Sequence, residues 1–178
     1  MEQGAAKILR TLDRHLTGPG KLRLMGGAAL ILGYGMSRST EDADLLQDDA
    51  EMQALVDEAD IGAALEKANL ELAPEGLYLS HIWGPEQQIL TPSWRESCRK
   101  ISLVGLTHLA LEVLGPLDLI LSKLCRADAG DLEDIRYLIG HLGLRPDEVR
   151  GALQSAVVPT EFAAVFPANA LKVERELG

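Results

Sequence analysis

Two aspartates and two glycines lie close together in the sequence, in a pattern that could hold a metal ion and a phosphate. They belong to the stretch LMGGAALILGYGMSRSTEDADLL, residues 24–46. Asp42 and Asp44 are two positions apart, so on a strand both carboxylates point to the same side, roughly 7 Å apart. Two such carboxylates repel each other unless a cation lies between them. Mg²⁺ suits this pair, because it takes oxygen ligands and completes its coordination with waters and substrate phosphates. A second metal ion could share one carboxylate and activate a hydroxyl.

Gly26 and Gly27 add a candidate phosphate site. They follow KLRLM, which is predicted as a short strand, and precede AALILGY, which is predicted as a buried helix. A strand, a Gly-Gly turn and a helix N-terminus leave backbone N–H groups that can bind an anion at close range. With the aspartate pair, this pattern indicates a nucleoside triphosphate bound with its metal, and phosphoryl or nucleotidyl transfer. Each motif is also common as a plain turn or strand end, so a purely structural reading stays open.

The periodicity of apolar residues predicts the elements around these motifs. Ile8, Leu9, Leu12 and Leu16 share one face of a helix over residues 4–16,. A helix is expected after Asp48 or Asp49, and Asp60 is expected to cap another with its side chain. The remaining predicted strands are residues 42–47, 76–83, 100–104 and 107–114, with an irregular loop over residues 84–97.

The pattern changes at Gly115-Pro116, after which the chain is predicted to be helical,. The sequence therefore predicts an α+β protein, with a mixed α/β part over residues 1–114 and a helical part over residues 115–178. Because no linker separates the two parts, we expect them to pack as a single compact unit.

Composition narrows the function classes. The chain of 178 residues carries 17 Lys and Arg against 27 Asp and Glu, a net charge of −10. This charge argues against a general nucleic-acid binder, but it leaves room for a local basic pocket or for a metal that bridges the protein to phosphate. Cys98 and Cys125 suggest neither a disulfide framework nor a zinc site. No apolar run approaches the roughly 18 residues of a membrane span, and the N-terminus lacks a signal-peptide pattern, so a cytoplasmic protein is expected.

At these residues the sequence resembles the nucleotidyltransferase superfamily that includes DNA polymerase β. In that superfamily Gly-Gly or Gly-Ser precedes Asp-x-Asp by a helix and a loop, and Gly26, Gly27, Asp42 and Asp44 match this order. The string from Arg38 to Leu45, RSTEDADL, is similar to a minimal bacterial branch with the form Arg-x-Thr-x-Asp-x-Asp. The better-known relatives of that branch are the AbiEii-type toxins of abortive-infection systems.

A second stretch, GPLDLILSKLCRADAGDLEDIRYLI, resembles the Pro…Lys…Asp-Leu-x-Asp-Ile segment of the same branch. Pro116, Lys123, Asp131 and Asp134 take the matching positions. The weaker stretch TPSWRES is similar to a Pro-x-x-Trp segment of the branch. The resemblance thus touches most of residues 20–140.

The resemblance implies a nucleotidyltransferase fold, with a mixed central sheet flanked by helices. It implies that Asp42 and Asp44 hold Mg²⁺ or Mn²⁺ as metal ligands and catalytic residues. The nucleotide-binding residues would then be Gly26, Gly27, Arg38, Thr40, Lys123 and Asp131. On the residues alone, Lys123 could be a solvated helix side chain and Arg38 could balance an aspartate. Asp131 and Asp134 could orient Lys123 or an arginine, or Asp131 could be just a first-turn acid that the helix dipole stabilises.

Active members of the superfamily carry a third carboxylate on a neighbouring strand. The expected place, Tyr78-Leu79-Ser80-His81, holds none. Glu112 is the other candidate, because it faces away from Leu109, Leu111 and Val113 and could lie on a polar side of its strand.

The resemblance favours an enzyme that moves a nucleoside monophosphate from a nucleoside triphosphate to an acceptor hydroxyl. The acceptor would be RNA, such as tRNA, or a protein, and the chain could be the toxin of a toxin–antitoxin pair with an antitoxin protein as its partner. The alternative is a catalytically impaired nucleotide- and metal-binding domain that acts by binding. No membrane partner is expected.

Overall fold

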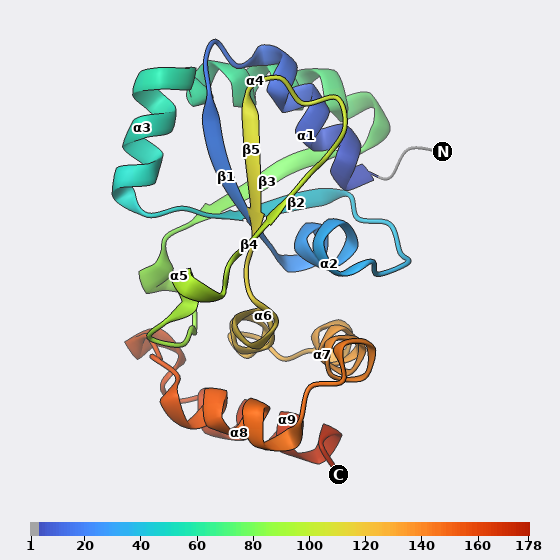
Figure 1. Cartoon of the computed structure of the whole chain (residues 1–178), viewed down its shortest axis with the longest axis vertical. Helices are drawn as coiled ribbons and strands as arrows, with labels where there is room; N and C mark the ends of the chain where they lie inside the picture. The colour runs from blue at the N-terminus through green and yellow to red at the C-terminus, as the bar shows by residue number, and fades with distance from the viewer. Residues whose placement is uncertain (1–3) are drawn as a thin grey trace. The chain divides into compact units, whose positions relative to one another are not determined.

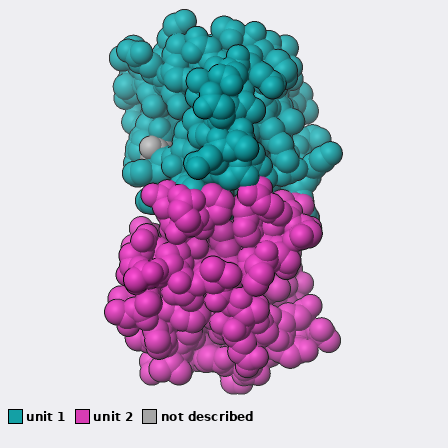
Figure 2. Space-filling model, turned by 90° about the vertical axis from the view of Figure 1, so that its left-hand side faces the viewer, with its two compact units in different colours: residues 1–84, 99–113 teal, residues 85–98, 114–178 magenta. Residues whose placement is uncertain are grey.

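The structure of the chain is a computed structural model that describes residues 4–178, apart from the side chain of Ser80. The chain divides into two compact units, shown in different colours in Figure 2. Unit 1 consists of Met1–Gly84 and Arg99–Val113, and unit 2 of Pro85–Cys98 and Leu114–Gly178. The sequence places a division at residue 114, whereas residues 85–98 group with the C-terminal helices.

Unit 1 is built on a five-stranded mixed sheet with the order β3-β2-β1-β5-β4. The strands are β1 Gly20–Met25, β2 Asp42–Leu46, β3 Tyr78–Trp83, β4 Arg99–Ile101 and β5 Leu109–Val113. β1 pairs with β5 in parallel and β2 pairs with β3 in parallel, while β1–β2 and β4–β5 are antiparallel. The predicted mixed sheet is confirmed, and each of the predicted strands forms, although β4 covers only the start of the expected segment.

Alternation of side chains fixes which face of this sheet is buried. On β1, β2 and β5 one set of apolar side chains is at most 9% exposed, namely Leu22, Leu24, Ala43, Leu45, Leu109, Leu111 and Val113. The residues between them are mostly charged: Arg23, Asp42, Asp44 and Glu112. The polar residues of the predicted site are therefore carried on the face of the strands opposite these apolar side chains.

Four longer helices complete unit 1: α1 Gly4–His15, α2 Gly26–Tyr34, α3 Asp49–Ala59 and α4 Ile61–Leu72 (Figure 1). α1 packs against α4, α2 packs against β1 and β2, and α3 packs against β1. Asp48 caps α3 in a capping box with Glu51, as one of the two predicted positions,. The predicted cap at Asp60 is confirmed in position only, because Asp60 is the N-cap residue of α4. Its backbone takes a left-handed conformation, with φ of 49°, to end α3, and its side chain makes no capping bond to α4.

Unit 2 is helical. Its longer helices are α6 Pro116–Lys123, α7 Ala129–Leu142, α8 Pro146–Ser155 and α9 Phe166–Glu176. Residues 85–98, predicted as an irregular loop, contain the 3₁₀ helix η2, Pro85–Gln87, and the one-turn helix α5, Trp94–Ser97. Across residues 4–178, no helix is both long enough and apolar enough to cross a membrane.

Candidate functional site

The two aspartates of the predicted metal site lie on β2, and both are half-buried. Asp44 is in register with Met25 of β1 on one side and with His81 of β3 on the other. The Oδ1 atom of Asp42 accepts a hydrogen bond of 2.9 Å from the Thr40 hydroxyl. The Oδ1 atom of Asp44 lies 3.7 Å from His81 Nδ1. The carboxylates are thus held in place but keep part of their surface open.

Gly26 brings the Asp44 carboxylate against the N-terminus of α2. A Cβ atom at this position would lie 2.9 Å from Asp44 Oδ2. The φ angle of Gly26 is +59°, a left-handed conformation that glycine adopts without the steric cost other residues meet,. Glycine is therefore required here both for the backbone turn and for the close approach of the carboxylate.

Gly27 lies beside the other two nucleotide-binding candidates of unit 1. A Cβ atom on Gly27 would lie 3.2 Å from Arg38 Nη2 and 3.3 Å from Thr40 Oγ1. The N-cap residue of α2 is Met25, whose side chain makes no capping bond. The first N–H groups of a helix have no partner within the helix, so a helix without a side-chain cap can direct them at an anion. A cation and a hydroxyl thus lie next to a helix N-terminus that fits a phosphate.

Replacing Gly26 with Ala is expected to disturb both halves of this arrangement. The added methyl group must displace the Asp44 carboxylate, and the alanine must adopt an unfavourable φ. The unfavourable φ costs on the order of 1–3 kcal/mol of folding stability. We expect G26A to lower the thermal midpoint and to weaken metal-dependent nucleoside triphosphate binding. Gly76 is the matched control, because its φ is also positive, at 69°, but nothing lies within 4 Å of its Cβ position. If G26A and G76A change the nucleotide affinity equally, Gly26 is not part of the nucleotide-binding site.

Glu112 lies on β5 in register with Arg23 of β1. Its carboxylate is 2.9 Å from Lys21 Nζ and 3.4 Å from Arg23 Nη2. Within residues 4–178, no three Asp, Glu, His or Cys side chains form a group that could hold a metal ion. The structure therefore does not bring Glu112 to Asp42 and Asp44 as a third metal ligand.

In the structure, Glu112 forms an ion pair with Arg23, a buried cation that was not predicted from the sequence. Arg23 is 3% exposed, and its guanidinium donates two hydrogen bonds, of 2.9 and 2.7 Å, to Glu51. Burial by itself raises the pKa of Glu51, but hydrogen bonds from Arg23 and from the backbone N–H of Asp48 outweigh it, so the pKa lies below its usual value. Glu51 is therefore ionised at neutral pH. The one signal in the sequence was an arginine within the apolar strand KLRLM.

Lys123 and Asp131 lie in unit 2, where they bind each other. Lys123, the last residue of α6, is 9% exposed, and its ammonium pairs with Asp131 at 3.4 Å and also with Asp134. Asp131 also accepts hydrogen bonds of 2.9 and 3.0 Å from Arg126. It belongs to the capping box at the start of α7, together with Asp128. Asp131 therefore contacts both Lys123 and an arginine, Arg126. It is also an acidic residue in the first turn of α7, so the two descriptions do not exclude each other. A contact of Lys123 with phosphate stays a prediction.

Comparison with known proteins places the chain in a family. A family model described as "nucleotidyltransferase of unknown function (DUF6036)" matches residues 5–142, which is more than half of the chain. The matched range contains the two glycines, the aspartate pair and helices α6 and α7. No curated protein and no solved structure gave a match. The chain thus belongs to this family of nucleotidyltransferases of unknown function.

Proposed function

We propose that this chain is a metal-dependent enzyme that transfers a nucleoside monophosphate from a nucleoside triphosphate to an acceptor hydroxyl. One observation carries the proposal: the Asp44 carboxylate lies against Gly26, at the N-terminus of α2. This contact puts a metal ligand beside backbone N–H groups that suit a phosphate, and a metal-bound triphosphate needs both at once.

The residues present fit Mg²⁺ or Mn²⁺. Asp42 and Asp44 supply hard oxygen ligands from one face of β2, and both side chains are only half-buried. Mg²⁺ is commonly bound by one or two carboxylates together with waters and substrate phosphates, so a third protein ligand is not needed to hold it. When bound, the metal would offset the charge of the phosphates and favour ionisation of the attacking hydroxyl.

The other residues of unit 1 would bind and orient the substrate. The backbone N–H groups of Gly26 and Gly27 would hold phosphate oxygens, and Arg38 would add a positive charge beside them. Thr40 would keep Asp42 in position through its hydrogen bond. In the reaction, the acceptor oxygen forms a bond to the α-phosphorus, the bond between that phosphorus and the bridging oxygen breaks, and pyrophosphate leaves. Lys123 and Asp131 are proposed as further nucleotide-binding residues on the family resemblance alone.

Calorimetric titration with each of the four nucleoside triphosphates, with and without Mg²⁺, tests the binding half of the proposal. We expect saturable binding of at least one nucleotide in Mg²⁺ and little binding in a chelator. If no nucleotide binds with metal present, the Gly-Gly and Asp-x-Asp motifs act as a turn and a strand end only.

Substituting Glu112 with Gln distinguishes its two candidate roles. The pairing with Arg23 predicts a loss of about 1–3 kcal/mol in folding stability, with transfer changed by less than about tenfold, because Glu112 is not grouped with the aspartates. A third catalytic carboxylate would instead lose on the order of 10² to 10³ in rate with binding intact. Chemical denaturation and a transfer assay at saturating nucleotide measure the two effects.

A catalytically impaired nucleotide-binding domain is the second candidate, and the position of His81 favours it. A register shift on β3 next to Asp44 places His81 opposite that aspartate, on the strand where the family resemblance implies a carboxylate. If the chain acts by binding, the wild type is expected to bind nucleotide with metal but to label no acceptor. His81→Asp should then gain transfer activity, and transfer by the wild type would contradict this candidate.

The acceptor and the biological role are proposed more broadly. RNA, such as tRNA, or a protein is the proposed acceptor, and a toxin with a partner antitoxin is the proposed role, because residues 38–45 resemble the branch related to AbiEii-type toxins. A net charge of −10 disfavours broad nucleic-acid binding,. An RNA acceptor would therefore be held locally at the site. A cytoplasmic location is proposed as well.

A further inference from the structure

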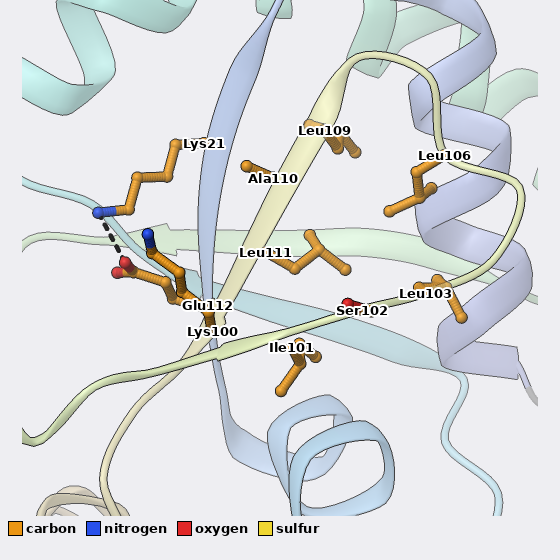
Figure 3. A pocket seen from close by; sticks show the side chains of 10 residues that line it. All are labelled: Lys21, Lys100, Ile101, Ser102, Leu103, Leu106, Leu109, Ala110, Leu111 and Glu112. Atoms are coloured by element: carbon orange, nitrogen blue, oxygen red, sulfur yellow. Dashed lines mark ion pairs between the residues drawn. The ribbon is translucent and has the colours of Figure 1, made fainter.

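A recess of about 510 Å³ lies beside β4 and β5 in unit 1, and neither the aspartate pair nor the Gly-Gly motif is among the residues that line it (Figure 3). It exists because β4 is short. β4 pairs with Leu111, Glu112 and Val113 only, and ends at Ile101. The chain then leaves the sheet as a loop over residues 102–108. The first two residues of β5, Leu109 and Ala110, are therefore not covered by the β4 ladder.

The loop that borders this recess is held in a fixed position. The buried carboxylate of Asp13 accepts hydrogen bonds of 2.7, 2.8 and 2.8 Å from the backbone N–H groups of Thr107, His108 and Leu109. Arg10 donates a hydrogen bond of 2.8 Å to the carbonyl oxygen of Val104. These bonds fix both the middle and the end of the loop. The recess is accordingly preformed, as small-molecule sites usually are.

The walls of the recess differ in character. Figure 3 shows the apolar side chains on one side of β5 and the charged ones on the other. The apolar wall consists of Ile101, Leu103, Leu106, Leu109 and Leu111. Ala110 points to the same side of β5 as Lys21 and Glu112, and its small side chain leaves space there (Figure 3).

The charged wall carries an excess of positive charge in an acidic protein. It consists of Lys21, Lys100 and Glu112, and the Glu112 carboxylate is already paired with both Lys21 and Arg23. Lys100 lies in register with Glu112 and is exposed. Among residues 4–178, the Lys100 side chain has no hydrogen bond or ion pair. Its ammonium is thus available to a ligand.

We propose that this recess binds an elongated amphipathic anion, a small molecule with an apolar body and a terminal carboxylate. The apolar body lies along the leucine-rich wall, and the carboxylate meets Lys100. A nucleotide fits this recess poorly, because its several phosphate charges would meet one available ammonium and a carboxylate. The inference is independent of the proposed nucleotidyl transfer.

Titration with octanoate tests the site, followed by calorimetry and by backbone amide shifts in NMR spectra. We expect saturable binding with a dissociation constant on the order of a millimolar or below. Shifts should be confined to residues 100–112 and the neighbouring part of β1. Each methylene removed, down to butyrate, should weaken binding by up to about fourfold. Octylammonium, which has a matching body and the opposite charge, should bind more weakly.

Two variants assign the two ends of the ligand. Lys100→Gln removes the ammonium and should weaken octanoate binding by up to about fivefold, the scale of an exposed ion pair. Lys67→Gln is the matched control, since Lys67 is an exposed lysine on α4 outside the recess. Ala110→Phe should fill the space and abolish binding. Ala110 is exposed, so this variant is expected to fold, which its amide spectrum checks.

Three results would overturn the proposal. Octylammonium could bind as tightly as octanoate, the affinity could survive Ala110→Phe, or the octanoate-induced shifts could map away from β4 and β5. Nucleoside triphosphate binding by the same samples is a separate readout, and its presence or absence has no bearing on the outcome.

Discussion

Replacing Asp42 and Asp44 together with Asn is expected to abolish Mg²⁺-dependent nucleoside triphosphate binding while the protein stays folded. A charged contact of this kind is worth about 1.5–3 kcal/mol, roughly a 10- to 150-fold change in affinity. The double variant loses two of them. Folding stability should stay level or rise, because removing the charges also removes the repulsion between two carboxylates on one face of β2. Calorimetric titration and thermal unfolding of the same sample give both readouts.

The matched control replaces two other aspartates of unit 1. Asp49 and Asp57 lie on α3 and are exposed, so Asp49→Asn with Asp57→Asn produces the same change in net charge. This control should bind the nucleotide as the wild type does. Unchanged Mg²⁺-dependent affinity in the Asp42 and Asp44 double variant would remove these residues from the metal site.

Lys123→Ala is expected to cost about 3–5 kcal/mol of folding stability, the largest effect of any single substitution considered for this chain. Its ammonium is buried between Asp131 and Asp134, whose side chains are 5% and 3% exposed. Without it, two buried carboxylates lose a shared cation, although Asp131 keeps its bonds to Arg126. Chemical denaturation measures the loss.

Arg126→Ala provides the contrast, because it removes a second cation from the same Asp131. The Arg126 side chain is 72% exposed, so its loss should cost about 1 kcal/mol or less. If the two substitutions lower the folding stability equally, the burial of Lys123 is not the cause of its contribution to stability. If Lys123→Ala folds, a greater loss of affinity for a triphosphate than for a monophosphate would support the predicted phosphate contact. Equal losses would argue against that contact.

The contacts of the candidate site that a single sequence can predict are those between residues that are close along the chain. Gly26, Gly27, Thr40 and Asp44 lie within twenty residues of one another, and one strand, one helix and one loop suffice to bring them together. Their contacts follow from turn chemistry and strand alternation. The strands were also recognisable, because apolar alternation and flanking glycines leave a pattern that a single sequence shows.

Contacts that depend on strand order or burial were not predictable. Glu112 was proposed as a catalytic acid because it was expected on the polar side of its strand. Its position on that side of β5 is as predicted. Which cation it meets depends on β5 lying next to β1, an arrangement that places it beside Arg23. The register shift that brings His81 to Asp44 leaves no trace in residues 78–83. The pairing of Lys123 with Asp131 was one of the predicted alternatives, but its burial, with 9% of Lys123 exposed, was not.

Transfer of label from a nucleoside triphosphate is the direct test of the proposed metal-dependent nucleotidyl transfer. The protein is incubated with each α-³²P-labelled nucleotide, Mg²⁺ or Mn²⁺, and either total RNA or a protein extract, beside the Asp42 and Asp44 double variant. We expect the wild type to label a macromolecular acceptor, the labelling to need the metal and stop in a chelator, and the double variant to label nothing. Labelling by the double variant at the wild-type rate would contradict the account, as would a wild type that binds nucleotide with metal but labels no acceptor in either mixture.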